Sequence, residues 1–145
     1  MIDSFQGEHR FLSNFYPCKI SCRGVPLPSN EHYYVVRKLD VSDEATLRHI
    51  SKLTAGGVKR YGRENTQDPK MKDTFWRLTV MMDGLRQKFS WHKNPELTNM
   101  LINTGDNELV EGNHWGDTFW GVCDGVGHNH LGKLLMNHRK RLIDF

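Results

Sequence analysis

The sequence contains no apolar run that approaches the roughly 20 residues a transmembrane helix needs. Its first ten residues, MIDSFQGEHR, hold neither a basic segment nor an apolar core, so we expect no signal peptide. Its three cysteines, Cys18, Cys22 and Cys123, form no CxxC pair, and an odd count does not suit a disulfide framework. We therefore expect reduced thiols in a cytoplasmic protein that does not associate with membranes.

An excess of charge of one sign is also lacking. The formal net charge is +3, which is compatible with a phosphorylated ligand but does not demand nucleic acid. The eight histidines show no zinc-binding spacing, so we predict neither a metal site nor a cofactor. The chain has no repeat, no low-complexity segment and no linker, and its 145 residues suit a single domain over residues 1–145.

The spacing of apolar residues predicts a mainly helical α+β domain with a small β-sheet. Further helices are expected to begin at Ser29 or Asn30, at Ser42 or Asp43, at Thr54 and at Pro95. The helix after Thr54 is expected to end at Gly62. The longest expected helix covers residues 69–89, where six apolar residues recur at intervals of four and three: Met71, Phe75, Leu78, Met82, Leu85 and Phe89.

Two short strands are predicted near the beginning of the chain. Residues 18–22 alternate between two faces, as a strand does, and residues 25–27 suit a short return strand. Asn14 lies just before them, between aromatic residues, where it can fix a loop against a ligand or against backbone. Phe15 beside it would be a core residue by default.

The stretch 109–142 carries the strongest functional signal. A short apolar strand at Leu109 and Val110 leads into a loop that holds Asp117 between Trp115 and Trp120. A glycine-rich turn follows, and then a helix for which Asn129 is in an N-cap position. Free N–H groups at a helix start favour phosphate, and Lys133 adds a cation. Gly132 in the first turn indicates that something packs close to the backbone. The pattern indicates a nucleotide-type site; the alternative is an ordinary strand–loop–helix with buried tryptophans.

A second group of candidates lies on the expected helices of the first half. Glu31 falls in the first turn of its helix, with Lys38 on the same side. Such a carboxylate can take part in catalysis, or it can simply interact favourably with the helix dipole. Lys59 and Arg63 lie near a helix end, where they suit a phosphate or pyrophosphate, or again only the dipole.

Eight motifs occur in the order in which they occur in a known family: LSNFYP, LPSNEHYYVVRK, VKRYGR, QKF, NTG, LVE, DTFWG and GHNHLGKLLM. The chain thereby resembles the NADAR family of YbiA-like proteins over nearly its whole length. The resemblance implies a small, mainly helical α+β domain. It also implies an N-glycoside hydrolase, either of the riboflavin-biosynthesis-intermediate type or of the type that removes ADP-ribose from guanine in nucleic acid.

The resemblance also assigns residues. The glutamate of the family's Ser-Glu-His motif falls on Glu31, with Asn30 in place of the serine. The aspartate of its D-x-x-W-G motif falls on Asp117, followed by Trp120, and its G-x-N-x-L-G signature falls on Asn129 and Gly132. The family's catalytic tryptophan position is occupied by Asp73. Either Trp76, one helical turn later, or Trp115, in a loop where the family pattern has no tryptophan, takes its place.

The expected chemistry follows from those residues. A carboxylate stabilises the positive charge that builds on the ribose and orients the attacking water. We assign this to Asp117, and we place Glu31 beside the leaving group or sharing the water. Aromatic faces would stack on a base. Ligand binding is thus expected of Asn14, Phe15, Lys38, Lys59, Arg63, Trp115, Trp120, Asn129, Gly132 and Lys133, with Trp76 joining the two carboxylates in catalysis.

Three functional interpretations remain. The first is an N-glycosidase, whose partner is a small phosphorylated nucleotide-like substrate or an ADP-ribosylated nucleic acid. The second is a module that binds ADP-ribose or a nucleotide with little turnover, which the displaced tryptophan motivates. The third is a nucleic-acid-binding protein, suggested by basic and aromatic residues together, although the weak charge counts against it. Nothing in the sequence indicates an oligomeric state.

Overall fold

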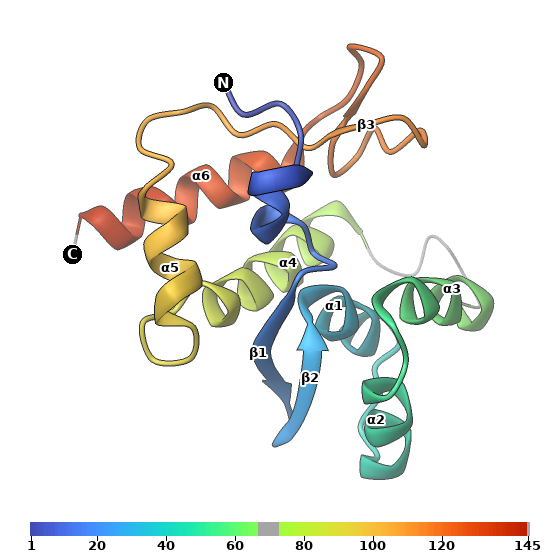
Figure 1. The fold of residues 1–145 in the computed structure, drawn as a ribbon. Coiled ribbons are helices and arrows are strands. Elements are labelled where there is room, and N and C mark those ends of the chain that lie inside the picture. Colours follow the sequence, from blue (N-terminus) through green and yellow to red (C-terminus); the bar gives the residue numbers. More distant parts are fainter. Residues whose placement is uncertain (67–72, 145) are drawn as a thin grey trace. The chain divides into compact units, whose positions relative to one another are not determined.

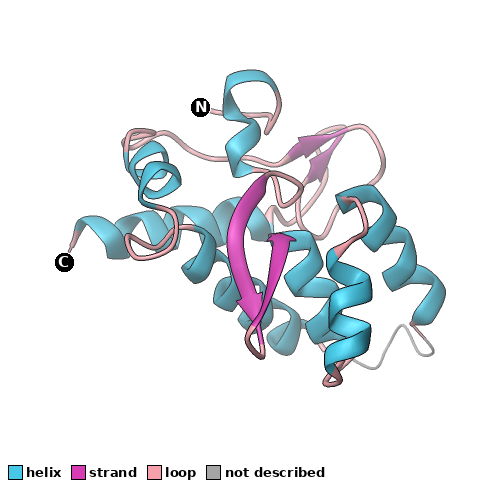
Figure 2. Ribbon diagram, turned by 60° about the horizontal axis from the view of Figure 1, so that its bottom comes forward, coloured by secondary structure: helices cyan, strands magenta, loops and turns pink. Residues whose placement is uncertain are grey.

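The computed structural model describes residues 1–66 and 73–144. Its contacts form two compact units, one made of Asn14–Asn94 and the other of Met1–Ser13 with Pro95–Phe145. The α+β prediction is confirmed, since helices dominate and two separate two-stranded sheets accompany them (Figure 2). In chain order the elements are η1 (Gly7–Leu12), β1 (Pro17–Cys22), β2 (Val25–Ser29), α1 (Asn30–Lys38), α2 (Glu44–Ser51), α3 (Ala55–Asn65), α4 (Thr74–Lys88), α5 (Pro95–Ile102), β3 (Gly112–Asn113), β4 (Val122–Cys123) and α6 (His130–Ile143).

The unit Asn14–Asn94 is built around the antiparallel hairpin of β1 and β2 and the helix α1 that follows it. Helix α1 packs against both strands and against α3 and α4 (Figure 1). Ile20, Val25 and Leu27 turn inward from the hairpin, and Tyr33, Val35 and Val36 turn inward from α1. Both predicted strands are therefore confirmed.

The predicted helix starts in this unit are confirmed at their caps. The side chains of Ser29, Asp43 and Thr54 accept hydrogen bonds from the backbone N–H groups of His32, Thr46 and Gly57. Each side chain thereby satisfies an N–H group that has no partner within the first helical turn. The predicted end at Gly62 is wrong, because α3 continues to Asn65. Gly62 is buried instead, and a Cβ there would lie 3.1 Å from a methyl group of Val35.

The core stripe predicted for α4 is confirmed at Leu85 and Phe89, which are completely buried, and is wrong at Phe75. The helix expected over residues 69–89 begins only at Thr74, with Asp73 as an extended N-cap, and Pro69 and Met71 lie outside the described residues. Phe75 is 80% exposed, and Leu78 and Met82 are only half-buried. The buried face carries Val80, Met81, Gly84, Leu85 and Lys88. The predicted and the observed face both have helical spacing and share Leu85, and the sequence pattern indicated the face without glycine and lysine.

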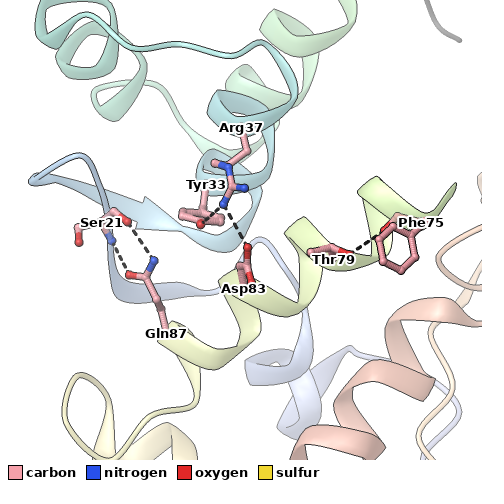
Figure 3. Close-up of polar contacts among 7 residues, drawn as sticks. All are labelled: Ser21, Tyr33, Arg37, Phe75, Thr79, Asp83 and Gln87. Carbon is pink, nitrogen blue, oxygen red and sulfur yellow. Dashed lines mark hydrogen bonds and ion pairs between the residues drawn. The ribbon is translucent and has the colours of Figure 1, made fainter. Parts of the chain in front are cut away.

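The outer edge of β1 is occupied by two side-chain amides. Asn94 accepts a hydrogen bond from the Lys19 N–H at 2.9 Å and donates to the Lys19 carbonyl at 2.8 Å. Gln87 makes the same pair with the backbone of Ser21, at 3.0 Å in each direction (Figure 3). Nearby, Arg37 bridges the Tyr33 hydroxyl and Asp83, which ties α1 to α4 (Figure 3).

The other unit combines the first residues of the chain with its last third. Helices α5 and α6 pack together, and Arg139 of α6, which is buried, donates to Thr104 at 2.8 Å. Leu109 forms only an isolated parallel bridge with Ile2, so the expected strand at this point is a single bridge. Beyond it, β3 and β4 form a short parallel pair.

Across residues 1–66 and 73–144, no helix has the length and apolar character needed to cross a membrane.

Candidate functional site

The loop between β3 and β4 holds Asp117 in a fixed conformation. One carboxylate oxygen, Oδ1, accepts hydrogen bonds from the backbone N–H groups of Phe119 at 3.1 Å and Trp120 at 2.9 Å. Asp117 therefore closes its own tight turn, as aspartate commonly does in loops. No described residue donates to its other carboxylate oxygen, Oδ2, and the side chain is only half-buried. One oxygen therefore organises the loop, and the other makes no contact within it.

Asn113 and Glu111, which the sequence analysis did not propose as site residues, stabilise this loop through hydrogen bonds. Asn113, which is 5% exposed, accepts from the Asp117 N–H at 3.0 Å and donates to the Asp117 carbonyl at 2.9 Å. Its amide also donates to the Glu111 carboxylate at 3.1 Å. The only signal in the sequence was that Glu111 ends the LVE motif and that Asn113 follows two residues later.

Close packing explains why the last position of the D-x-x-W-G motif, Gly121, is a glycine. A Cβ on Gly121 would lie 1.8 Å from the Glu111 carboxylate and 2.8 Å from the Asn113 amide nitrogen. Any side chain at this position would displace the Glu111–Asn113 pair. Gly121 is therefore required by the same contacts that fix Asp117.

The expectation that the start of α6 offers free N–H groups to phosphate is wrong for its first two residues. The N–H groups of His130 and Leu131 donate to the carbonyls of Phe119 and Trp120, at 3.2 and 3.0 Å. Those carbonyls come from the Asp117 loop, which returns alongside the helix start. Long-range pairing of this kind cannot be read from local sequence.

Asn129 and Gly132 are explained by the same packing. Asn129 is the N-cap residue, in a left-handed conformation with φ 53°, but its side chain makes no capping hydrogen bond. It donates instead to the Leu109 carbonyl at 2.9 Å and accepts from the Glu111 N–H at 2.9 Å. A Cβ on Gly132 would lie 2.1 Å from the Leu109 carbonyl oxygen. The close packing predicted at Gly132 is present, and its partner is backbone.

The rings of the two residues Phe119 and Trp120 contact each other, and Phe119 also contacts the start of α6. Trp120 contacts Phe119 edge to face at 4.7 Å between ring centres, and Phe119 contacts His130 at 4.6 Å. His128 stacks on His130 at 5.2 Å. Trp120 is half-buried, whereas Trp115 is 57% exposed and Lys133 is exposed. The described residues contain no group of three or more His, Cys, Asp or Glu arranged to hold a metal ion.

In the other unit, Glu31 is positioned by the start of α1. Its N–H donates to the Asn14 carbonyl at 3.1 Å, and the Asn14 side chain accepts from the Asn30 amide at 3.0 Å. Asn14 therefore fixes the preceding loop against the helix start, which is one of the two roles expected for it. Ser29 caps the helix, so Glu31 lies in its first turn, as predicted.

Glu31 lies in a partly buried, mainly cationic environment. Burial lowers the pKa of the Lys38 ammonium, and the nearby Glu31 carboxylate offsets part of that effect. Burial raises the pKa of the Tyr34 hydroxyl, which accepts a hydrogen bond from Arg77 at 3.3 Å. The prediction that Lys38 lies on the same side as Glu31 is consistent with this electrostatic coupling.

Two further predicted residues meet at α3. The Lys59 ammonium lies 5.8 Å from the ring centre of Phe15, within the range of a cation–π contact. Phe15 is 42% exposed, so it is not the core residue that its apolar character would suggest. Arg63 is exposed on the same helix.

Trp76 lies in the first turn of α4. Asp73 caps this helix by accepting from the Trp76 N–H at 2.8 Å. Asp73, which the family resemblance places at the catalytic tryptophan position, therefore has a clear local role as a helix cap. Trp76 itself is half-buried.

The predicted site residues fall into two sets, one in each unit. Asn14, Phe15, Glu31, Lys38, Lys59, Arg63 and Trp76 belong to Asn14–Asn94. The second set belongs to the unit that contains Pro95–Phe145, and it comprises Trp115, Asp117, Trp120, Asn129, Gly132 and Lys133.

Comparison with known proteins gives matches over nearly the full chain. A family model described as the NADAR domain matches residues 3–143. A riboflavin biosynthesis protein of Vibrio vulnificus is 41% identical over 138 residues, which is 93% of this chain but only 36% of that protein. The N-glycosidase YbiA of Escherichia coli is 33% identical over 141 residues, covering 96% of this chain and 85% of YbiA.

Two further comparisons agree with these. An N-glycosidase of Nostoc punctiforme is 31% identical over 134 residues, covering 90% of this chain and 84% of that protein. The solved NMR structure of E. coli YbiA superimposes with a TM-score of 0.74 at 30% identity, covering 99% of this chain and 88% of that chain.

Proposed function

Because this chain belongs to the NADAR domain family, we propose that it is an N-glycosidase. It would hydrolyse the bond between a base or amino-pyrimidine and ribose phosphate or ADP-ribose. The observation that carries the proposal is the similarity to two proteins named as N-glycosidases, each matched over at least 90% of this chain. The similarity to a riboflavin biosynthesis protein supports an intermediate of that pathway as one substrate class.

Asp117 would act on the ribose. Breaking an N-glycosidic bond leaves positive charge on the sugar, and a carboxylate nearby stabilises that charge and can orient the attacking water. The half-buried Asp117 has Oδ1 committed to two backbone N–H groups. Its Oδ2 would therefore be the oxygen that faces the sugar or the water.

Glu31 would act beside the leaving group or share the water. The departing nitrogen gains electron density, so it needs a proton or a hydrogen bond from a neighbouring acid. A carboxyl group in the first turn of a capped helix is held at a defined position, which general acid–base catalysis requires. Two acids in different surroundings can divide such roles.

Basic and aromatic residues would position the rest of the substrate. Lys59, Arg63 and Lys38 would hold the phosphate or pyrophosphate, and Lys133 would add a further cation. Lys59 already lies over the ring of Phe15, so a phosphate and a stacked ring could be bound close together there. Trp76 or Trp115 would contact the leaving base, together with Trp120 and Asn14.

The test is a product assay with purified protein and the variants Glu31→Gln and Asp117→Asn. The substrates are the phosphoribosylamino-pyrimidine of riboflavin synthesis, ADP-ribose, NAD and an oligonucleotide ADP-ribosylated on guanine. We expect release of free base or sugar phosphate from at least one substrate, with turnover reduced at least about 100-fold in both variants.

Matched controls are Glu44→Gln and Asp124→Asn. Glu44 is a solvent-exposed carboxylate paired with Arg48 on α2, and Asp124 is an exposed residue of the glycine-rich turn. Both controls should retain wild-type turnover. If every substrate remains intact in the presence of the wild-type protein, the N-glycosidase proposal is wrong.

A module that binds ADP-ribose without turnover is the second candidate. It is favoured by one observation, namely that Asp73, at the family's tryptophan position, serves as the cap of α4. Calorimetric titration with ADP-ribose would reveal binding without products. A salt titration against unmodified DNA and RNA tests the third candidate, since binding driven by phosphates must weaken steeply as salt rises.

A further inference from the structure

We propose that Asn113 is a positioning residue for the Asp117 carboxylate, an inference that rests on the proposed N-glycosidase function. Asn113 does not reach the substrate in this proposal. It holds the backbone of Asp117 so that Oδ1 stays bound to the loop and Oδ2 is presented in one direction. Asn113 was not among the residues that the sequence or the family motifs indicated.

The first step of the argument is that Asp117 needs an external support. The three residues before it, His114, Trp115 and Gly116, are all exposed, and Gly116 has φ 85°, a conformation that glycine adopts with little strain. A segment of this kind cannot fix the peptide group of Asp117 by its own packing.

The second step is that Asn113 supplies this support at both backbone atoms of Asp117. Its Oδ1 accepts from the Asp117 N–H at 3.0 Å, and its Nδ2 donates to the Asp117 carbonyl at 2.9 Å. A single planar amide thus fixes the backbone on either side of the Asp117 Cα atom. The direction of the Cα–Cβ bond, and with it the carboxylate, follows from that orientation.

The third step is that Asn113 itself is firmly held. It is 5% exposed, and its backbone pairs with Cys123 in the parallel ladder of β3 and β4. The carboxylate of Glu111, which accepts from Nδ2 at 3.1 Å, fixes which side of the amide faces the Asp117 carbonyl. Gly121 leaves the space that this pair occupies.

The consequence for catalysis is specific. Loss of the Asn113 amide would let the Asp117 carboxylate sample other directions, and a displacement of about 1 Å can reduce a rate about 100-fold. Because Asn113 makes no contact with substrate in this proposal, KM should change little while kcat falls.

The experiment combines kinetics with hydrogen exchange on Asn113→Leu, which has a side chain of similar size without polar atoms. We expect kcat to fall at least about 30-fold with KM within about threefold of wild type. The amide hydrogens of Phe119 and Trp120 should lose their protection, because they donate to the carboxylate that is released. If Asn113→Leu fails to fold, Asn113→Asp carries the same test, since it lacks the donor to the Asp117 carbonyl.

The control is Asn107→Leu, because Asn107 also ties a turn by donating to a backbone carbonyl, that of Thr104 at 2.8 Å. It should leave kcat and the exchange of Phe119 and Trp120 unchanged. Retention of wild-type kcat in the Asn113 variants would overturn the inference, as would loss of kcat with Phe119 and Trp120 still protected. If the wild-type protein cleaves no substrate, the proposed function fails, while the exchange measurement still decides whether Asn113 holds Asp117.

Discussion

Lys88 has a completely buried side chain at the end of α4. Its ammonium group lies 5.1 Å from the ring centre of Phe89, and the neighbouring Cys18 lies on β1. Burial lowers the pKa of Lys88 to about 8, and the Cys18 thiolate would act in the opposite direction. A charged lysine in this position is costly at neutral pH, so the folded chain releases its proton more readily than the unfolded chain.

The first prediction concerns the pH dependence of stability. Between pH 8 and 9 the unfolded chain binds more protons at Lys88 than the folded chain, so the free energy of unfolding should rise with pH, by up to about 1 kcal/mol. Above pH 9 the buried Cys18 thiol, whose pKa is raised, opposes this rise. Urea unfolding should show the full rise in wild type and in Lys93→Met, a partly exposed lysine. The rise should be smaller in Lys88→Met, where Lys38, whose pKa burial also lowers, still contributes.

The second prediction concerns His32, which is 1% exposed. One ring nitrogen lies 2.7 Å from the Ser29 hydroxyl and the other lies 2.7 Å from the Leu53 carbonyl, an arrangement that suits a neutral ring. Burial lowers its pKa, and the hydrogen bond to Leu53 offsets part of the effect. Stability is therefore present above about pH 6.5 and lost as the pH falls through the lowered pKa.

The measurement for His32 is urea unfolding at pH 7.5 and pH 5. The free energy of unfolding should fall toward pH 5 in wild type and in His92→Gln, an exposed histidine. In His32→Gln it should be lower by about 1–3 kcal/mol at pH 7.5 and should decline less toward pH 5. An equal decline in all three proteins would contradict the assignment.

Among the elements, the crossing of α1 and α4 depends on one glycine. A Cβ on Gly84 would lie 1.9 Å from the side-chain oxygen of Asn30 and 3.1 Å from the ring of Tyr33. Asn30 is fully buried and also donates to Asn14 and Met81. The polar side chain at the start of α1 therefore occupies the space that Gly84 leaves in α4.

The third prediction compares two glycines within helices. Gly84→Ala should lower the free energy of unfolding by at least about 2 kcal/mol, because Asn30 or the helix must move. Gly56→Ala in α3, where nothing lies within 4 Å of the new Cβ, should raise it by about 0.5–1 kcal/mol. Thermal and urea unfolding of both variants would measure these changes, and equal effects of one sign would refute the packing argument.

The sequence predicted those parts of the fold that depend on neighbours along the chain. The caps Ser29, Asp43 and Thr54 and the hairpin follow local rules, and they were predicted correctly. The buried face of α4 was predicted only in part, because it includes Gly84 and Lys88, which are accommodated by other elements. The occupied N–H groups at the start of α6 and the support by Asn113 likewise depend on long-range contacts. Whether Glu31 and Asp117 carry the chemistry stays a prediction, which the variant assay tests.

At the scale of the molecule, one of the two units is assembled from both ends of the chain. The Ile2 N–H donates to the Glu108 carbonyl and the Ile2 carbonyl accepts from the Val110 N–H, both at 2.8 Å. A Cβ on Gly112 would lie only 2.2 Å from the backbone carbonyl oxygen of Asp3, so the first residues pack closely on this glycine. The first residues thus hold the segment that leads directly to Glu111 and Asn113.

The fourth prediction is that removal of residues 1–4 weakens this segment. The amide of Val110 should lose its protection from hydrogen exchange, and turnover should fall because Glu111 and Asn113 are less well held. The amides of α1, in the other unit, provide the internal reference. Unchanged exchange at Val110 would mean that the segment is held by other contacts.

The amides of Gln87 and Asn94 have a consequence for how this protein behaves in concentrated solution. An exposed strand edge offers a template on which another polypeptide can add as a further strand, which is a common route to aggregates. Here the backbone groups of Lys19 and Ser21 already have partners on that side of β1. An extended peptide can therefore add to the hairpin along β1 only if the side chains of Gln87 and Asn94 first move away. These two amides take the place of a third strand, and the sheet of β1 and β2 stays two-stranded.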